Sequence, residues 1–515
     1  MAHPEHGCSN DTNTSETAVR AMGAIIPYRR APLYKSFVEL LRFSQIFTKK
    51  RNIVQYAGRR SVHDTSMTGK ECVLRTYRHE KLDTIPWVPF AGVHVGKLTG
   101  YTATEVLADA EKLLESLRES HRIYRPDGQP VVFDLQLEAE VLGAELLWAD
   151  TGPPTVASHP LAATKDIPDR LPTASDGRYP IVLDVMKRFS AEVGDTTALF
   201  GLLCGPFTLA SHLRGMDLFM DMFDDPEYVK RLVAYCNRVA MRVAELYIEA
   251  GMDIVATVDP LVSQISPEHF TEFLTEPFTE FFTFLRERNV ISSFFVCGDA
   301  GKNIEVMCGT APDGISIDEN IPFATAKAIT DRHNITLGGN LPLTTVMLLG
   351  NQQDNMKAVI DQIDSVAAGN MIISPGCDMP YDTPIENVVA VEQAVHRTDQ
   401  TREMIANYER VDDDIEVELP DYAALTRPLV EVFTLDSETC AACTYMFGAA
   451  LDVKKTSAIE IDVVEYKYTK RENIARCKAM GVKQLPSIYI NGKLAYSSVI
   501  PNRDELARAI TAAAQ

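Results

Sequence analysis

The chain of 515 residues carries 71 acidic and 50 basic side chains, a formal net charge of -21, and 46% of its residues are hydrophobic. This composition is that of a globular protein and fits neither an intrinsically disordered chain nor a fibrous repeat. The acidic surplus argues against nucleic acid or an anionic membrane as a partner, because both bind basic surfaces. Ten cysteines are too sparse in such a chain for a disulfide scaffold.

The N-terminal part predicts little regular structure. Residues 1–30 are expected to form a disordered tail, and residues 31–84 a helical lead-in. The first residues lack a basic segment followed by an apolar core, so we expect no secretory signal. Since the chain contains no run of about 18 apolar residues, we also expect no membrane span and, by default, a cytoplasmic location.

Residues 85–397 alternate short apolar runs with longer segments of helical period. Continuous hydrophobicity is typical of parallel strands buried on both faces. One intervening helix is expected to be capped by Asp224 or Asp225, to have Pro226 in its first turn and to stop at Gly251. Eight such strands favour an α/β fold of the (β/α)8 TIM-barrel type, and a doubly wound open sheet is the alternative. The expected strands are Trp87–Ala91, Val131–Leu135, Ala198–Cys204, Asp253–Asp259, Ile291–Cys297, Gly314–Asp318, Ile335–Gly339 and Met371–Ser374.

A polar linker over residues 398–428 leads to a smaller C-terminal unit, residues 429–515. An apolar strand precedes Cys440-Ala-Ala-Cys443 and a helix, a second strand is expected over Ala458–Val464, and Asn491-Gly492 predicts a hairpin between the last two strands. The order β-α-β-α-β-β-α with a C-x-x-C after the first strand indicates a small thioredoxin-like α/β domain.

The two cysteines of this domain predict thiol–disulfide chemistry. Cys440 falls at a helix N-terminus, where the helix dipole lowers a thiol pKa, and Cys443, one turn later, can resolve a mixed disulfide. Pro486 after Leu485 matches the cis-proline loop that faces the cysteines in this fold. A structural metal site is the alternative, but no second C-x-x-C supports it. We therefore predict a redox module with a thiol–disulfide partner, in which Cys440 and Cys443 are catalytic.

Catalytic groups of a (β/α)8 barrel lie at the carboxyl ends of its strands. Cys297 and Cys377 stand beside glycines at two such ends, and two thiolates that converge on one rim can hold Zn²⁺. The alternative is that they are small buried hydrophobic residues. The further candidates at strand ends are Asp259 and Asn340 for catalysis, and His94, Cys204 and Asp318 for cofactor binding.

An ordered series of motifs runs through the barrel region: Thr84-Ile-Pro-Trp-Val-Pro89, Gly-Pro-Phe-Thr-Leu-Ala at 205–210, Glu249-Ala-Gly-Met-Asp253, Val296-Cys-Gly298, Gly339-Asn-Leu341, Ser374-Pro-Gly-Cys377 and Thr383-Pro-Ile-Glu-Asn387. Over roughly residues 68–397 this series resembles the uroporphyrinogen decarboxylase superfamily. Its true decarboxylases carry an Arg-Gln-Ala-Gly-Arg motif whose arginines hold the carboxylates of the substrate. The corresponding stretch here, residues 89–96, contains no arginine, which disfavours decarboxylation of a polycarboxylate.

The other branch comprises methylcobamide:thiol methyltransferases, which bind zinc through His-x-Cys and a distant cysteine. Cys297 and Cys377 fall on the two cysteines, but Phe295 replaces the histidine, so the resemblance leaves zinc binding open. It implies transfer of a methyl group between a methylcobamide and a small thiol or folate acceptor. Since the chain contains no Asp-x-His-x-x-Gly motif, a separate corrinoid protein is the expected carrier of the methylcobamide.

The leading hypothesis is thus a corrinoid-dependent methyltransferase fused to a C-x-x-C redox module. A decarboxylase of porphyrin biosynthesis is one alternative. A non-catalytic, redox-sensing binding protein, whose barrel has lost its metal together with the histidine, is the other.

Overall fold

The computed structural model describes residues 67–367, 369–409, 415–438, 441–497 and 500–514, and every statement below refers to these residues. The predicted tail, most of the lead-in, part of the linker and Cys440 lie outside them. In the described part of the chain no helix is long and apolar enough to cross a membrane.

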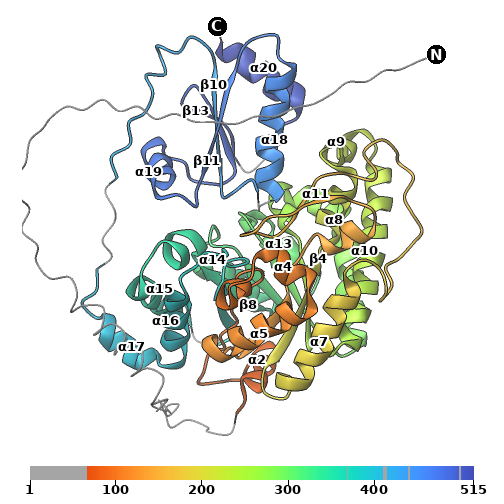
Figure 1. Ribbon diagram of the computed structural model, residues 1–515, viewed down its shortest axis with the longest axis vertical. Helices are drawn as coiled ribbons and strands as arrows, with labels where there is room; N and C mark the ends of the chain where they lie inside the picture. Colours follow the sequence, from red (N-terminus) through yellow and green to blue (C-terminus); the bar gives the residue numbers. More distant parts are fainter. Residues whose placement is uncertain (1–66, 368, 410–414, 439–440, 498–499, 515) are drawn as a thin grey trace, which may run out of the picture. The chain divides into compact units, whose positions relative to one another are not determined.

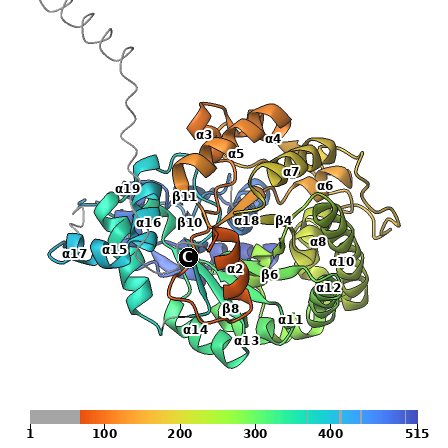
Figure 2. The ribbon, with the colours of Figure 1, turned by 90° about the horizontal axis from the view of Figure 1, so that it is seen from below.

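The larger sheet consists of seven parallel strands in the order β1-β4-β5-β6-β7-β8-β9. The strand order follows the chain without the reversal that a doubly wound sheet requires, so the prediction of a TIM-type barrel is favoured over its alternative. Figure 2 shows the helices lying around the outside of this curled sheet. The strands are β1 (Gly128–Val132), β4 (Ala198–Cys204), β5 (Ile254–Val258), β6 (Ile291–Val296), β7 (Gly314–Ile317), β8 (Thr336–Leu341) and β9 (Met371–Pro375).

The predicted first strand, Trp87–Ala91, is reduced to a single parallel bridge between Trp87 and Ile373. The Val88 N–H donates to the Ile373 carbonyl over 3.0 Å, and the Asp127 N–H donates to the Trp87 carbonyl over 3.0 Å. This extended segment therefore pairs with β9 on one side and with the residues before β1 on the other. Pro86 and Pro89 flank the bridge, and because proline has no N–H they cannot continue a ladder. Seven of the eight predicted strands are thus present, but the second, predicted over Val131–Leu135, lies earlier in the chain, at Gly128–Val132.

The predicted crossover helix is α10, Pro226–Glu249. The Asp225 side chain accepts a hydrogen bond from the Tyr228 N–H, and the chain leaves the helix at Gly251, whose φ of 94° suits glycine. The other helices of this part are α2 (Gly69–Tyr77), α3 (Val95–Thr99), α4 (Ala103–Ala108), α5 (Ala110–Tyr124), α6 (Leu137–Val141), α7 (Tyr179–Val193), α8 (Pro206–Arg214), α9 (Asp217–Asp224), α11 (Pro267–Phe273), α12 (Thr275–Glu287), α13 (Ile304–Cys308), α14 (Phe323–Arg332), α15 (Gln352–Asp364), α16 (Ile385–His396) and α17 (Thr398–Ile405).

Short elements complete the barrel region. They are the hairpin of β2 (Leu146–Leu147) and β3 (Thr155–Val156), the 3-10 helices η1 (Pro260–Gln264) and η2 (Gly301–Asn303), and the π-helix η3 (Leu343–Leu348).

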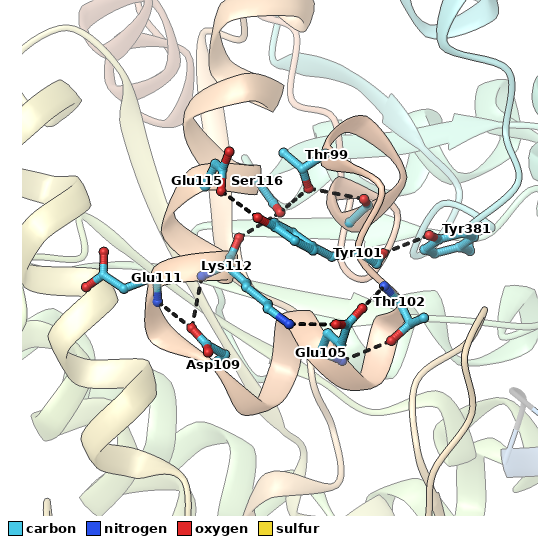
Figure 3. Close-up of polar contacts among 11 residues, drawn as sticks. Thr99, Tyr101, Thr102, Glu105, Asp109, Glu111, Lys112, Glu115, Ser116 and Tyr381 are labelled. Atoms are coloured by element: carbon cyan, nitrogen blue, oxygen red, sulfur yellow. Dashed lines mark hydrogen bonds and ion pairs between the residues drawn. The ribbon is translucent and has the colours of Figure 1, made fainter.

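Helices α3 to α5 anchor the loop that follows β9 (Figure 3). Thr102 and Glu105 form a reciprocal capping box at the start of α4, and Lys112 of α5 pairs with Glu105 over 2.6 Å. The Tyr381 hydroxyl donates to the Tyr101 carbonyl over 2.8 Å. The loop after β9 is thereby tied to a turn that lies 280 residues earlier in the chain.

Alternate strand residues divide the barrel core into two clusters. Phe200 of β4, Ala256 of β5 and Phe295 of β6 belong to the cluster on the inner face of the curled sheet. Their neighbours on the same strands, such as Val255 and Phe294, pack with the surrounding helices. Burial on both faces explains why these strands appear in the sequence as continuous apolar runs.

The C-terminal sheet has the order β11-β10-β12-β13, in which β10 and β11 are parallel and the other pairs antiparallel. Figure 1 shows α18 and α20 on one face of this sheet and α19 on the other. Val432 and Ile488 pack with α18 and α20, whereas Phe433 and Tyr489 pack with Cys477 of α19. The elements are β10 (Leu429–Thr434), α18 (Ala441–Thr456), β11 (Asp462–Lys467), α19 (Arg471–Met480), β12 (Ser487–Ile490), β13 (Lys493–Ser497) and α20 (Arg503–Ala513).

The order of these elements is the one predicted from the sequence. The hairpin between β12 and β13 turns at Asn491 and Gly492, both with positive φ, as the Asn-Gly pair predicts. The second strand begins at Asp462, four residues after the predicted Ala458. The Leu485–Pro486 peptide bond is cis. The thioredoxin-like assignment and the domain boundaries stay predictions.

Candidate functional site

A cavity of about 750 Å³ opens at the carboxyl ends of the barrel strands. Cys297 follows β6, Asp318 follows β7 and Cys377 follows β9, and all three line it. Thr208 and His212 of α8 contribute to the same wall. This is the edge at which barrels of this type carry their chemistry, as predicted from the strand ends.

Cys297 and Cys377, 80 residues apart in the chain, form a disulfide with a Cα–Cα distance of 5.9 Å. The described residues contain no group of three or more His, Cys, Asp or Glu side chains that could hold a metal ion. Phe295, at the position of the family histidine, is fully buried in the inner cluster. The residues present therefore do not fit a zinc centre, and the zinc expectation finds no support here.

Three carboxyl groups beside the disulfide are shifted towards neutrality. Burial raises the pKa of Asp378 to about 8, and burial together with the charge of Asp318 raises the pKa of Glu319 to about 8. Burial also raises the pKa of Asp318. The Gly92 N–H donates to Asp378 over 2.6 Å, and a Cβ at Gly92 would lie 2.5 Å from the same carboxylate. Acids of this kind can accept or donate a proton near neutral pH.

Asp378 was not among the residues selected from the sequence. Its one signal is its position directly after Cys377, at a strand end, and nothing in the sequence shows that it accepts a hydrogen bond from the Gly92 N–H.

His94 is held between two partners rather than aimed at a ligand. Its Nδ1 lies 2.9 Å from the Tyr381 carbonyl and its Nε2 lies 2.7 Å from the Tyr124 hydroxyl. Because a carbonyl only accepts, Nδ1 carries the proton and the Tyr124 hydroxyl donates to Nε2. Burial lowers the pKa of His94 to about 4, which keeps the ring neutral. Both ring nitrogens are thus occupied, and His94 positions the loop after Cys377.

Asp259 and Cys204 are buried behind the cavity wall. Asp259 accepts hydrogen bonds from the Phe207 N–H over 2.9 Å, the Thr208 N–H over 3.0 Å and the Thr208 hydroxyl over 2.6 Å. It therefore caps the start of α8 and positions Thr208, which itself lines the cavity. Burial raises the pKa of Asp259 to about 7. Cys204 is fully buried, and burial raises the pKa of its thiol.

Asn340 supports the loop that carries Asp318. Its side-chain amide donates to the Asp318 carbonyl over 3.0 Å and to the Ile321 carbonyl over 2.7 Å. Asp318 in turn accepts from the Asn320 N–H over 2.9 Å. Of these residues Asp318 lines the cavity directly, and Asn340 acts through it.

The same cavity is bordered by residues of the C-terminal domain, among them Cys443, Leu435 and Leu485. Cys443 is buried and accepts a hydrogen bond from the Leu435 N–H over 3.3 Å. Pro486 directly follows the cavity-lining Leu485. Cys440 lies outside the described residues, so the predicted roles of the three redox residues stay predictions.

Comparison with known proteins connects this site to one family. The family described as Uroporphyrinogen decarboxylase (URO-D) matches residues 68–398. A methylcobamide:CoM methyltransferase, MtbA, from Methanosarcina acetivorans is 28% identical over 333 residues, which cover 63% of this chain and 96% of that protein. MtbA of Methanosarcina mazei is 27% identical over 63% of this chain and 96% of its own length.

More distant relatives and a solved structure extend the comparison. The uroporphyrinogen decarboxylase of Wolbachia pipientis is 25% identical over 52% of this chain and 79% of its own. A solved methyltransferase from Methanosarcina mazei has a TM-score of 0.59 and 21% identity, and covers 65% of this chain and 99% of that one, so it shares the fold. The prediction of an enzyme of the methyltransferase class is confirmed by these relatives. Through residues 68–398, the chain belongs to the uroporphyrinogen decarboxylase (URO-D) family.

Proposed function

We propose that this chain transfers a methyl group between a methylcobamide, carried by a separate corrinoid protein, and a small thiol. The two relatives that the chain covers over 96% of their length are methylcobamide:CoM methyltransferases by name. The observation that carries the proposal is the cavity at the strand ends, which contains Cys297 and Cys377 and whose described lining includes no arginine. A folate is the second candidate for the acceptor.

The charge of the cavity disfavours the decarboxylase alternative. Its described lining includes five carboxylate side chains, and the cations there are two lysines, Lys470 and Lys483. A tetrapyrrole with many carboxylates needs several guanidinium partners in bidentate pairs, and the described lining offers none. Relatives of both kinds exist, and the composition of this wall supports the proposal of methyl transfer.

The lining residues can bind the acceptor and take up its proton. Phe133, Leu135 and Leu343 contribute apolar surface, which excludes water from the methyl group. Glu319 and Asp378, with pKa values of about 8, are mostly protonated at pH 7, and their ionised fraction, which grows as the pH rises through 8, can accept the proton of an acceptor thiol. Loss of that proton gives the thiolate, which is the nucleophile in methyl transfer. The methylcobamide supplies the methyl group when its carrier protein is bound.

The test is an anaerobic reaction of the purified chain with methylcobalamin and coenzyme M. Loss of the cobalt–methyl absorbance and formation of the methyl thioether, measured by mass spectrometry, are the expected results. Glu319→Gln should lower the rate by about 100-fold if Glu319 accepts the proton, whereas Glu227→Gln, an exposed change on α10, should leave it unaltered.

The outcomes separate the three functions. Absence of demethylation with every thiol and with tetrahydrofolate refutes methyl transfer. Turnover of uroporphyrinogen would instead support the decarboxylase. Failure in both assays would leave the non-catalytic, redox-sensing binding protein.

The C-terminal domain is proposed to be a thioredoxin-like redox module in a cytoplasmic protein, with a thiol–disulfide partner. The sheet order β11-β10-β12-β13 and the position of Cys443 in the first turn of α18 support this assignment. Repeated oxidation and reduction of Cys440 and Cys443 in thiol buffers, followed by alkylation and mass spectrometry, tests it. A pair that never oxidises reversibly is not a redox site.

A further inference from the structure

His212 of α8 is a buried histidine in the wall of the cavity, one helical turn after Thr208. It is 2% exposed and lines the cavity at the carboxyl ends of the barrel strands. It is not among the residues that the sequence singles out, because it lies within a helix and not at a strand end. A histidine in this position can bind a ligand only if one of its ring nitrogens is not engaged by the protein.

The two ring nitrogens of His212 have different surroundings. Nδ1 lies 4.0 Å from the sulfur of Cys204, which is fully buried behind the wall. Nε2 has no hydrogen-bond partner in the described part of the chain, and it is not one of the fully enclosed polar atoms there. Since His212 lines the cavity, Nε2 is the ring nitrogen that a ligand in the cavity can reach.

Cys204 decides which ring nitrogen of His212 carries the proton. Burial raises the pKa of the Cys204 thiol well above its ordinary value, so the thiol keeps its hydrogen and presents it to Nδ1. Burial, and to a lesser degree the nearby His159, lowers the pKa of His212 to about 3, so the ring is neutral. A neutral imidazole whose Nδ1 accepts a hydrogen bond carries its proton on Nε2. His212 thus offers the cavity an uncharged N–H donor.

Neighbouring contacts hold this donor in place, and the nearby hydroxyl group cannot replace it. The His159 Nδ1 donates to the His212 carbonyl over 2.8 Å, which fixes the last turn of α8. The Thr208 hydroxyl donates to Asp259 over 2.6 Å and accepts from the Leu261 N–H over 3.3 Å, so its hydrogen is not available to a ligand. Among the described residues of α8 that line the cavity, His212 is therefore the one with a free donor.

His212 and the acids that accept the proton of a thiol lie on different sides of the mouth. α8 follows β4, whereas Glu319 comes after β7, and β5 and β6 lie between these two strands in the sheet. Phe133 and Pro260 add apolar surface to the lining. A small acceptor whose sulfur lies near Glu319 therefore presents its other end to His212.

We propose that His212 selects the acceptor by donating a hydrogen bond from Nε2 to an oxygen atom at the end of the thiol opposite the sulfur. This inference rests on the proposed methyl transfer, and it narrows the acceptor to small thiols that carry a hydroxyl, carbonyl or oxyanion oxygen. A hydrogen bond to an oxyanion is stronger than one to a neutral oxygen, so an acidic tail is favoured over a hydroxyl. A thiol without such an oxygen leaves the buried N–H unpaired and is disfavoured.

Binding is measured first, with methyl thioethers, because these cannot exchange with a disulfide. Calorimetry on the full-length chain compares 2-(methylthio)ethanesulfonate, 2-(methylthio)ethanol and ethyl methyl sulfide. His212→Phe keeps a ring but removes the donor. It should raise the Kd of the sulfonate at least about ten-fold and that of the alcohol about five-fold, and leave the weaker binding of the sulfide unchanged.

Two further variants control for the shape of the ring and for the loss of a histidine. His212→Gln keeps an N–H donor near the position of Nε2, and its Kd values should stay within about three-fold of those of the wild type. His269→Gln, on α11 and outside the described lining, should bind all three ligands like the wild type. Circular dichroism checks that each variant is folded.

Methyl transfer from methylcobalamin to coenzyme M, 2-mercaptoethanol and ethanethiol separates this inference from the proposed function. His212→Phe should raise KM for the two thiols that carry oxygen more than it lowers kcat, and leave kcat/KM for ethanethiol unchanged. Equal effects on all three thiols, no effect on any, or a His212→Gln variant as impaired as His212→Phe would overturn the assignment of His212 and leave methyl transfer standing. Oxygen-selective binding without turnover would support the hydrogen bond from His212 and refute methyl transfer alone.

Discussion

His396 is the last residue of α16. Its hydrogen bonds connect this helix to the edge of the sheet where the predicted first strand, Trp87–Ala91, is reduced to a single bridge. Its Nε2 lies 2.8 Å from Asp127, which precedes β1 and also accepts from the Trp87 N–H over 2.9 Å. Its Nδ1 lies 3.0 Å from Glu392, which pairs with Arg125. Burial by itself lowers the pKa of His396, but the hydrogen bonds to the two carboxylates outweigh it and raise the pKa to about 9.

The size of this effect follows from the shift. A rise from 6.5 to about 9 corresponds to about 3 kcal/mol at about 1.4 kcal/mol for each pKa unit. Because the side chain is 28% exposed, solvent screening reduces this to about 2 kcal/mol. The folded-state pKa is the higher one, so the stabilisation is complete below pH 6.5 and is lost as the pH rises through about 9.

Two measurements test the reasoning. Deuterium exchange at the ring C2 position, followed by mass spectrometry, gives the pKa of His396 directly. The urea midpoint of unfolding should be lower in His396→Gln than in the wild type at pH 6, and the difference should shrink towards pH 10. His333→Gln, which removes an exposed pair with Glu305, is the matched control and should show no comparable pH dependence. An exchange midpoint for His396 at or below 6.5 would refute the argument.

Three further substitutions test other parts of the barrel. Phe295→His restores a His-x-Cys pair with Cys297. We expect elemental analysis to find stoichiometric zinc in the variant and not in the wild type. In the absence of zinc, the buried polar ring should lower the free energy of unfolding of the variant by about 2 kcal/mol. Equal zinc in both proteins would contradict this. Asp259→Ala leaves two buried N–H groups of α8 without an acceptor, and should cost about 3 kcal/mol in urea denaturation. Arg178→Ala leaves the buried carboxylate of Asp134 without its ion-pair partner, and the free energy of unfolding should fall by about 3–5 kcal/mol. Replacing both Arg178 and Asp134 by alanine should restore part of this loss. Losses of less than about 0.5 kcal/mol in the last two variants would mean that these contacts do not hold the barrel together.

The sequence predicted the elements whose signals are local. Continuous apolar runs identified the seven parallel strands because burial on both faces leaves no polar alternation. Pro226 and Gly251 marked the ends of α10, whose cap is Asp225 rather than the alternative Asp224, and Asn491-Gly492 marked the hairpin. The error at Trp87–Ala91 arose because a run of apolar residues does not reveal which backbone N–H groups are missing from a ladder.

The candidate site was predicted less completely. The convergence of Cys297 and Cys377 on one cavity follows from the rule for strand ends, and the structure agrees. The same rule selected His94, Asp259 and Asn340, whose polar atoms are occupied by neighbouring backbone or hydroxyl groups. A strand end looks the same in the sequence whether its side chain faces a ligand or supports the wall behind it.

The sequence by itself determined the α/β character, the parallel strands, the two cysteine pairs and the loss of the family histidine at Phe295. Only the tertiary structure decided which polar groups face the cavity, because their partners lie far away in the chain. His94 meets Tyr381 across 287 residues, and Asp378 meets Gly92 across 286. Burial by such distant partners shifts the pKa values of Asp378 and His94 in opposite directions, since in both cases it disfavours the charged form.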